Sequence, residues 1–171
     1  MISSKRCSTP LDNNIKLRRE EGKLLPDPQP YRALVGSLIY LTITRPDIVF
    51  AVGLVSHYMQ SPRKPHLEAA KRILNYINST LDFGLLFRNG ISFILQSYAD
   101  ADLRGNMDDR RSTLGYMFTC SSAAISWCSK KQDLVSLSTM EAEYKATSLA
   151  AQECVCGGWS KMFIHQFLPQ L

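Results

Sequence analysis

The residues of this chain best suited to chemistry are acidic side chains in two short segments. Tyr98-Ala99-Asp100-Ala101-Asp102 closes a strand-like run, and Ser138-Thr139-Met140-Glu141-Ala142-Glu143-Tyr144 opens a helical one. An acid at a strand end and another in the first turns of a helix can form a Mg²⁺ site, and such an ion activates water against a phosphodiester. The pattern therefore indicates metal-dependent phosphodiester chemistry.

The two glutamates of the helical segment have different expected roles. Ser138 followed three residues later by Glu141 is a capping-box pattern, in which each side chain accepts a hydrogen bond from a backbone N–H group at the helix start. Glu143 lies about 200° further round the helix than Glu141, so we expect it to point away from the cap. Glu141 is thus assigned to capping, and Glu143 is left for chemistry.

Short strands and one helix must position these acids. Residues 91–99, 113–120 and 123–129 have strand character and are separated by turn-forming clusters, which predicts an antiparallel meander. The helix that starts after Ser138 has a narrow, alanine-rich apolar stripe, and Gly157-Gly158 is expected to weaken or end it. The second half of the chain, residues 83–171, is therefore read as a sheet-containing domain.

The first half of the chain is expected to be helical after a flexible arm. Residues 1–30 are polar, contain four prolines and show no sustained period, which is typical of an arm. Residues 31–82 contain three apolar stripes at helical spacing, joined by short connectors that favour antiparallel packing. The stripes are Leu34, Leu38 and Leu41, then Ile48, Val52, Val55 and Met59, then Leu67, Ala70, Leu74 and Ile77. The fold class predicted for the whole chain is α+β.

Composition restricts the class of protein and its partners. The net charge is +5, which suits a polyanionic partner such as nucleic acid. The five cysteines are odd in number and lack zinc-site spacing, so we expect reduced thiols. No apolar run approaches the roughly 20 residues of a membrane span, and no secretory segment opens the chain. An intracellular protein, cytoplasmic or nuclear and not secreted, is expected.

Taken together, these segments resemble the end of the Pol polyprotein of copia-type LTR retrotransposons, from the last part of reverse transcriptase into ribonuclease H. In the first half the similar segments are Tyr31-Arg32-Ala33-Leu34-Val35-Gly36-Ser37-Leu38-Ile39-Tyr40-Leu41, Thr44-Arg45-Pro46-Asp47-Ile48 and Ser61-Pro62-Arg63. In the second half they are Tyr98-Ala99-Asp100-Ala101-Asp102, Asp109-Arg110-Arg111-Ser112-Thr113, Ile125-Ser126-Trp127, Ser129-Lys130-Lys131-Gln132 and Glu141-Ala142-Glu143-Tyr144. The matches follow the family's order over nearly the whole chain.

The resemblance implies a function and the residues that carry it. It makes Asp100 and Glu143 the first two catalytic acids and metal ligands of a Mg²⁺-dependent enzyme that hydrolyses the RNA strand of an RNA–DNA hybrid. Asp102 shares strand parity with Asp100 and is a secondary candidate. Four basic residues are candidate phosphate contacts, because such contacts supply affinity without sequence preference. They are Arg110, Arg111, Lys130 and Lys131.

The chain also departs from the family. The family supplies a third catalytic aspartate from a later strand and a fourth near the domain end, whereas this sequence has no aspartate after Asp133 and no glutamate after Glu153. Catalytic groups that act as a unit fail together when one is lost. We therefore expect a truncated, inactive ribonuclease H-like fold of three strands and one helix. Its exposed sheet edge is expected to bind missing Pol segments or a second copy.

Other interpretations of the same residues stay open. Asp100 and Asp102 could form an ordinary polar strand end, and the basic residues could be solvated loop charge, with Arg110 paired to Asp108 or Asp109. Two rival functions follow. One is a non-catalytic remnant that binds nucleic acid, and the other is a co-opted protein-interaction module that docks through its apolar helices. Salt-dependent affinity for nucleic acid would favour the first.

Overall fold

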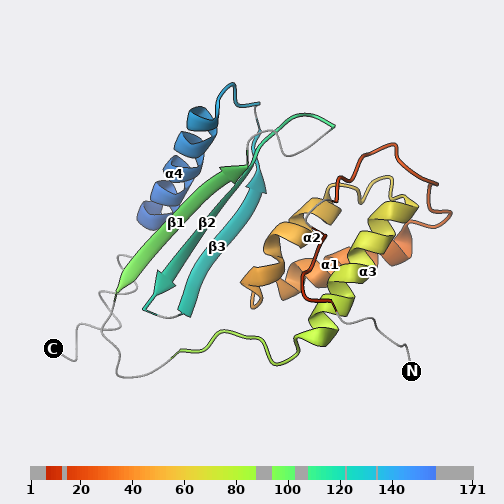
Figure 1. Ribbon diagram of the computed structural model, residues 1–171, viewed down its shortest axis with the longest axis horizontal. Helices are drawn as coiled ribbons and strands as arrows, with labels where there is room; N and C mark the ends of the chain where they lie inside the picture. Colours follow the sequence, from red (N-terminus) through yellow and green to blue (C-terminus); the bar gives the residue numbers. More distant parts are fainter. Residues whose placement is uncertain are drawn as a thin grey trace. The chain divides into compact units, whose positions relative to one another are not determined.

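The structure is a computed structural model of the 171-residue chain, and it describes residues 7–12, 15–87, 94–102, 108–121, 123–133 and 135–156. The chain divides into two compact units. The first unit comprises residues 1–89 with 106–109, and the second comprises residues 90–105 with 110–171. Figure 1 shows the three α-helices of the first unit and the sheet and helix of the second.

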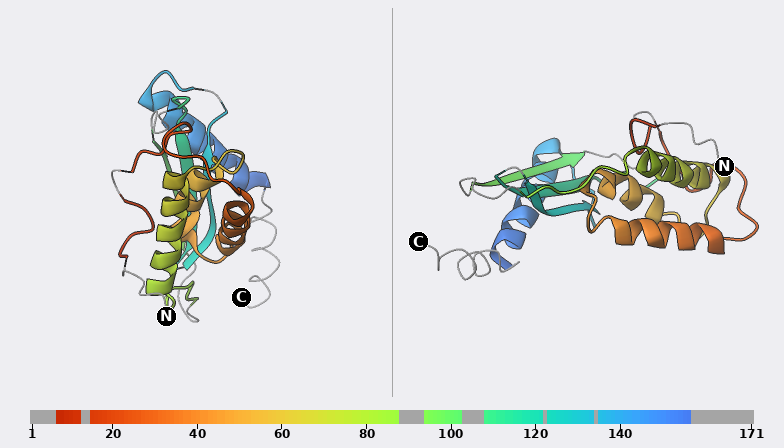
Figure 2. Two further views of the ribbon diagram at one scale, coloured as in Figure 1. Left: turned by 90° about the vertical axis from the view of Figure 1, so that its right-hand side faces the viewer. Right: turned by 90° about the horizontal axis from the view of Figure 1, so that it is seen from below.

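The first unit is built from helices that pack on one another. They are α1 (Gln29–Leu41), the 3₁₀ turn η1 (Pro46–Ile48), α2 (Val49–Ser56) and α3 (Lys64–Ser79). Figures 1 and 2 show α1, α2 and α3 side by side, and each contacts the other two. Pro46 begins η1 because a first helical residue needs no N–H group. The three predicted helices are therefore present.

The buried face of α3 differs from the predicted stripe. Ala69, Ala70, Ile73 and Tyr76 are buried, whereas Leu67, Leu74 and Ile77 are only partly buried. Tyr76 is buried on this face although it is polar, because its hydroxyl has a hydrogen-bond partner. The Tyr76 hydroxyl donates to Asp47 Oδ2 at 2.8 Å, which an apolar pattern alone does not reveal.

A hydrogen-bonded ion pair ties η1 to the end of α3. The Arg45 guanidinium is buried and donates to both oxygens of Asp47, at 2.9 and 2.8 Å. It also donates to the carbonyl and hydroxyl oxygens of Thr80, at 3.0 and 2.7 Å. The hydrogen bonds from Arg45 hold the pKa of Asp47 below its usual value. Because a buried charge is tolerated only when it is paired, this network fixes the connection between the two elements.

The described part of residues 1–30 packs against the helices. Leu17 is buried in the core of the first unit. Arg63 donates to the carbonyl oxygen of Gly22 at 2.8 Å, and a Cβ atom on Gly22 would lie 2.6 Å from Cδ of Pro65. The described part of this segment is therefore packed on the helices, and the flexible arm over residues 1–30 stays a prediction. Composition does not encode these contacts, because the Arg63–Gly22 hydrogen bond joins residues 41 positions apart.

The second unit contains an antiparallel sheet of three strands, ordered β1-β2-β3. The strands are β1 (Leu95–Asp102), β2 (Thr113–Cys120) and β3 (Ala123–Lys131). Their register is regular except for a shift between Phe118 and Thr119, opposite the start of β3. The predicted meander is confirmed. Residues 91–93 of the predicted first strand lie outside the described residues.

The helix α4 (Thr139–Cys156) packs against β1 and β2. Ala101 and Leu114 pair directly across these strands, and both belong to a buried cluster with Ala142 and Ala146 of α4. Small alanine side chains let the helix approach the sheet closely. The sheet and its helix, preceded by the helices of the first unit, confirm the predicted α+β class.

Within the described part of the chain, no helix has the length and apolar character that crossing a membrane requires. The glycine pair predicted to end α4 lies outside the described residues.

Candidate functional site

Asp100 and Asp102 lie on one face of β1. Side chains alternate between the two faces of a strand, so both aspartates project from the face opposite Ala101, which packs towards α4. One oxygen of Asp100 accepts the N–H of Ala101 at 2.8 Å. Partial desolvation and, second, the charge of Asp100 raise the pKa of Asp102. The two carboxylates therefore form a like-charged pair on the exposed strand.

Glu143 is exposed on α4, the helix that packs towards Ala101. Among the described residues, no group of three or more His, Cys, Asp or Glu side chains is placed to hold a metal ion. The structure thus groups Asp100 with Asp102 and does not gather Glu143 with them into one acidic cluster. The assignment of Asp100 and Glu143 as joint metal ligands stays a prediction.

The carboxylates of β1 are the kind of ligand that Mg²⁺ prefers, but they come from one strand only. Carboxylate oxygens are the hard ligands that Mg²⁺ prefers, and Asp100 and Asp102 supply such oxygens. A centre that holds two divalent ions needs carboxylates from several elements around one point, and the described residues provide this pair from a single strand. The described donor set therefore does not fit a two-ion centre.

Glu141 has the structural role that the sequence predicts, with one difference. The Ser138 hydroxyl accepts the N–H of Glu141 at 3.1 Å, as expected for a cap. The Glu141 carboxylate accepts the N–H of Leu137 at 2.8 Å, where a capping box would use that of Ser138. Lys145 lies 2.7 Å from the other Glu141 oxygen. The hydrogen bonds from Lys145 and then from Leu137 lower the pKa of Glu141.

A buried polar network connects the end of β3 to the start of α4. The Gln132 side chain donates to the carbonyl oxygen of Ala142 at 3.4 Å and accepts the Ser136 hydroxyl at 2.6 Å. The same hydroxyl accepts a hydrogen bond from Lys145 at 3.2 Å. Gln132 and Ser136 are both buried. The network fixes the position of Lys145, a residue that the sequence interpretation left out of the site.

Two of the predicted phosphate contacts, Lys130 and Lys131, line a cavity of about 320 Å³ beside β3 and α4. We call this cavity the lysine groove. One side of the groove is formed by residues of α4 that lie within two turns of the helix. The other side is formed by residues of β2, of β3 and of the segment after β3. The described residues that line it are Leu114, Lys130, Lys131, Gln132, Asp133, Lys145, Ser148, Leu149 and Gln152. Three lysines and one aspartate give it a positive balance.

Arg110 and Arg111 occupy a different place. Both are exposed and lie in the loop that leads into β2, and Arg110 has a left-handed backbone with a φ of 56°. Neither lines the lysine groove. The four basic residues of the prediction therefore divide into two pairs within the second unit.

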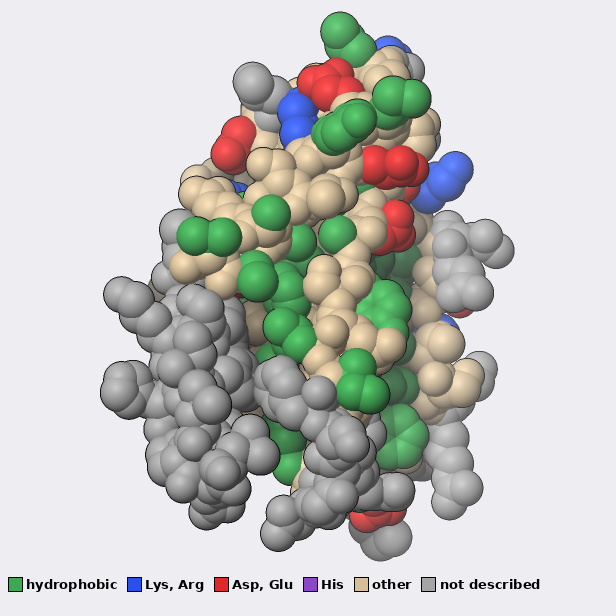
Figure 3. Space-filling view, turned by 90° about the vertical axis from the view of Figure 1, so that its left-hand side faces the viewer, with side chains coloured by type: hydrophobic (Ala, Val, Ile, Leu, Met, Phe, Trp, Pro, Cys, Tyr) green, Lys and Arg blue, Asp and Glu red, His purple; other side chains and the backbone are tan. Residues whose placement is uncertain are grey.

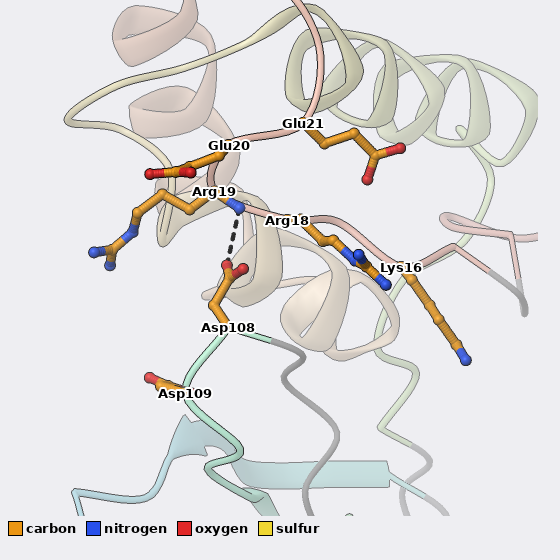
Figure 4. Close-up of a pocket in the computed structure, with 7 residues that line it drawn as sticks. All are labelled: Lys16, Arg18, Arg19, Glu20, Glu21, Asp108 and Asp109. Carbon is orange, nitrogen blue, oxygen red and sulfur yellow. Dashed lines mark hydrogen bonds between the residues drawn. The ribbon is translucent and has the colours of Figure 1, made fainter.

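A pocket of the first unit carries mixed charge (Figure 4). Asp108 accepts the N–H of Arg19 at 2.9 Å and holds the two segments of its lining together. Among the described residues, three basic and four acidic ones line it: Lys16, Arg18, Arg19, Glu20, Glu21, Asp108 and Asp109. Because acids outnumber bases, this pocket is a poorer anion site than the lysine groove.

Apolar side chains are exposed on the sheet near the aspartates. Tyr98 of β1 and Met117 of β2 pair across the strands on the Asp100 face, and their exposed fractions are 52% and 37%. Figure 3 views the molecule from the side of α4 and β1 and shows hydrophobic side chains in green, with acidic ones in red beside them. The exposed pair Tyr98 and Met117, on the sheet face opposite α4, is the observation relevant to a docking function.

The chain has relatives among known proteins. No family model matches it, and no solved structure matches it. It is 43% identical over 175 residues to the retrovirus-related Pol polyprotein from transposon TNT 1-94 of Nicotiana tabacum, which covers 97% of this chain and 13% of that protein. It is 42% identical over 153 residues to the corresponding polyprotein from transposon RE2 of Arabidopsis thaliana, covering 90% of this chain and 10% of that one.

A third relative is short. The secreted RxLR effector protein 161 of Plasmopara viticola is 45% identical over 127 residues, which cover 74% of this chain and 89% of that protein. Because this relative is named as secreted, the expectation of an intracellular location stays a prediction. This chain spans about a tenth of the length of the two Pol polyproteins. Over about nine-tenths of its length, the chain is therefore homologous to the Pol polyproteins of copia-type retrotransposons.

Proposed function

We propose that the second unit is part of a ribonuclease H-type segment of Pol and that this chain binds RNA–DNA hybrid without cleaving it. The observation that carries the proposal is the incomplete acidic set. Asp100 and Asp102 face the same side of β1, and no third acid, cysteine or histidine among the described residues joins them. An acid pair on the first strand followed by a meander and a helix fits the family's ribonuclease H segment.

The absence of cleavage follows from electrostatics. Hydrolysis of a phosphodiester by two divalent ions requires carboxylates that neutralise and place both ions. Removing one member of a catalytic set that acts as a unit costs nearly the whole rate enhancement. In the parental Pol activity that we propose, Mg²⁺-dependent hydrolysis of RNA, Asp100 and Glu143 are ligands. This chain keeps Asp100, but among the described residues Glu143 does not join Asp100 and Asp102 in a group of three acids placed to hold a metal ion.

Binding follows from the positive charge. The net charge of +5 attracts the polyanion, and contacts to phosphates give affinity that is independent of base sequence. Lys130 and Lys131 lie together at the end of β3, and Arg110 and Arg111 lie together before β2. These pairs are the proposed contacts to the hybrid backbone.

A cleavage assay tests the proposal. The purified chain is incubated with an end-labelled RNA–DNA hybrid and Mg²⁺ or Mn²⁺, and the products are separated by size. We expect a retarded complex under native conditions and an intact RNA strand under denaturing conditions. Cleavage that disappears in Asp100→Asn would overturn the proposal and show that a complete metal centre forms. Cleavage that persists in Asp100→Asn would identify a contaminating nuclease.

The exposed apolar pair Tyr98 and Met117 favours a second candidate function, association of this chain with a second copy through the β1 side of the sheet. β1 is at one edge of the described sheet, where backbone groups are open to strand pairing. Sedimentation at increasing protein concentration tests this candidate. A dimer that resists high salt but is lost in Tyr98→Lys would support it, and a monomer at all concentrations would exclude it.

A further inference from the structure

The lysine groove exists because a single helix packs against part of a three-stranded sheet. α4 packs over β1 and β2, and Lys130 and Lys131 at the end of β3 line the same cavity as residues of α4. Residues of α4 three, four and seven positions apart share the side of the helix that lines the groove: Lys145, Ser148, Leu149 and Gln152. Leu114 and Leu149 supply apolar lining, and Leu114 is buried. The groove is thus a concave site with polar walls.

Lys145 is a positioned cation. Its ammonium group lies 2.7 Å from a Glu141 oxygen and 3.2 Å from the Ser136 hydroxyl. An ammonium has three N–H donors, so one donor remains for a ligand after these two contacts. Because the side chain is already held, binding an anion costs less conformational entropy than ordering a free lysine.

The remaining lining suits a tetrahedral anion. Lys130 pairs with Leu114 across the sheet, and Lys131 is the last residue of β3. Both lie in the groove with Lys145, and Asp133 is the one acid among its described lining residues. Ser148 and Gln152 add neutral donors. A phosphate group accepts several charge-assisted hydrogen bonds at once, which matches this arrangement of donors.

We propose that the lysine groove binds one phosphate of a nucleic-acid backbone, with Lys130, Lys131 and Lys145 as its cationic partners. This inference rests on the proposed function and deepens it, because it names a binding site for the backbone of the hybrid. It adds Lys145 to the contacts and separates the groove from the Arg110 and Arg111 pair.

The test compares matched variants of the full chain. Anisotropy of a labelled RNA–DNA hybrid is measured between about 50 and 200 mM salt for the wild type and for Lys130→Gln/Lys131→Gln. The control, Lys64→Gln/Lys71→Gln, removes the same charge from exposed positions of α3. We expect the groove variant to weaken binding several-fold more than the control. We also expect it to flatten the plot of log affinity against log salt by about one unit.

Lys145 is tested by rescue. Lys145→Gln removes the cation, and Lys145→Arg keeps it beside Glu141. Circular dichroism verifies that α4 is retained in both. We expect Lys145→Gln to weaken binding of the hybrid and Lys145→Arg to restore most of it. Equal loss in both variants with α4 intact would overturn the role of Lys145.

The outcomes separate the two proposals. A wild-type chain that does not bind hybrid overturns the proposed function and the groove together. A wild-type chain that binds, with equal losses in the groove variant and the control, overturns the groove alone. Inorganic phosphate is added as a competitor at constant ionic strength. Displacement of the hybrid at micromolar phosphate would mean that the groove binds free phosphate. That result contradicts a site that is specific for the nucleic-acid backbone.

Discussion

Asp100 and Asp102 project from the same face of β1, and the charge of Asp100 is one of the causes that raise the pKa of Asp102. We predict that Asp100→Asn lowers the pKa of Asp102 towards the ordinary aspartate value, because the repulsion is removed while the partial desolvation remains. NMR titration of the Asp102 carboxyl carbon measures this shift. Asp133→Asn removes an exposed acid outside β1 and is the control. An unchanged Asp102 pKa in Asp100→Asn would show that the two carboxylates do not interact.

The two glutamates of α4 should respond differently to the same substitution. Glu141→Gln loses the charge that holds Lys145 and the N–H of Leu137, so we predict a lower melting temperature. Glu143→Gln changes an exposed side chain and should leave the melting temperature nearly unchanged. Ser138→Ala removes the cap and should cost about 1 kcal/mol. Thermal unfolding followed by circular dichroism measures all three, and equal effects of the two glutamate variants would refute the assignment.

Two glycines of the first unit form a matched pair for testing the packed N-terminal segment. Gly22 has a φ of 83° and its added Cβ would meet Pro65 at 2.6 Å, whereas an added Cβ on Gly36 of α1 meets nothing within 4 Å. We predict that Gly22→Ala lowers the free energy of unfolding by more than about 1 kcal/mol. Gly36→Ala should raise it by about 0.5–1 kcal/mol, because alanine favours a helix interior. Denaturant unfolding measures both free energies. An unchanged free energy of unfolding in Gly22→Ala would mean that this segment is not packed.

His66 should make the first unit less stable at acidic pH. Its ring is buried and stacks on Tyr58 at 3.9 Å, while Nδ1 accepts the N–H of Arg63 at 3.0 Å and Nε2 lies 3.0 Å from the Arg18 carbonyl oxygen. Burial lowers the pKa of His66 below 6.5. As pH falls below 6.5, the unfolded chain therefore binds the proton first. The free energy of unfolding then falls until the pH passes the folded-state pKa.

The variant His66→Gln isolates this effect. Its unfolding free energy should change less than that of the wild type between about pH 7 and the folded-state pKa, because the proton-binding group is gone. His57→Gln replaces an exposed histidine of the same unit and should keep the wild-type dependence. Denaturant titrations at several pH values measure the slopes. Parallel curves for the wild type and His66→Gln would contradict the prediction.

Local sequence pattern predicted the helices and strands, whereas the burial and contacts of single side chains depend on tertiary structure. Strand alternation placed Asp100 and Asp102 together, and the serine before α4 predicted where that helix begins, because both signals are contained within a few residues. The burial of His66 depends on the Arg18 carbonyl group, 48 positions away, and no local period encodes such a partner. The position of Lys145 likewise depends on its hydrogen bond to Ser136, nine positions away, a partner that the narrow alanine stripe does not specify.

The central claim is that this chain binds RNA–DNA hybrid and leaves it intact, and one time course tests it most directly. A hybrid labelled on its RNA strand is mixed with the full chain and Mg²⁺, and fluorescence anisotropy is followed for hours at low salt. We predict a rise on mixing that persists unchanged and reverses on addition of salt. Anisotropy that rises and then decays below the starting value, with the decay abolished in Asp100→Asn, would show cleavage and contradict the claim. No rise at any protein concentration would contradict it as well.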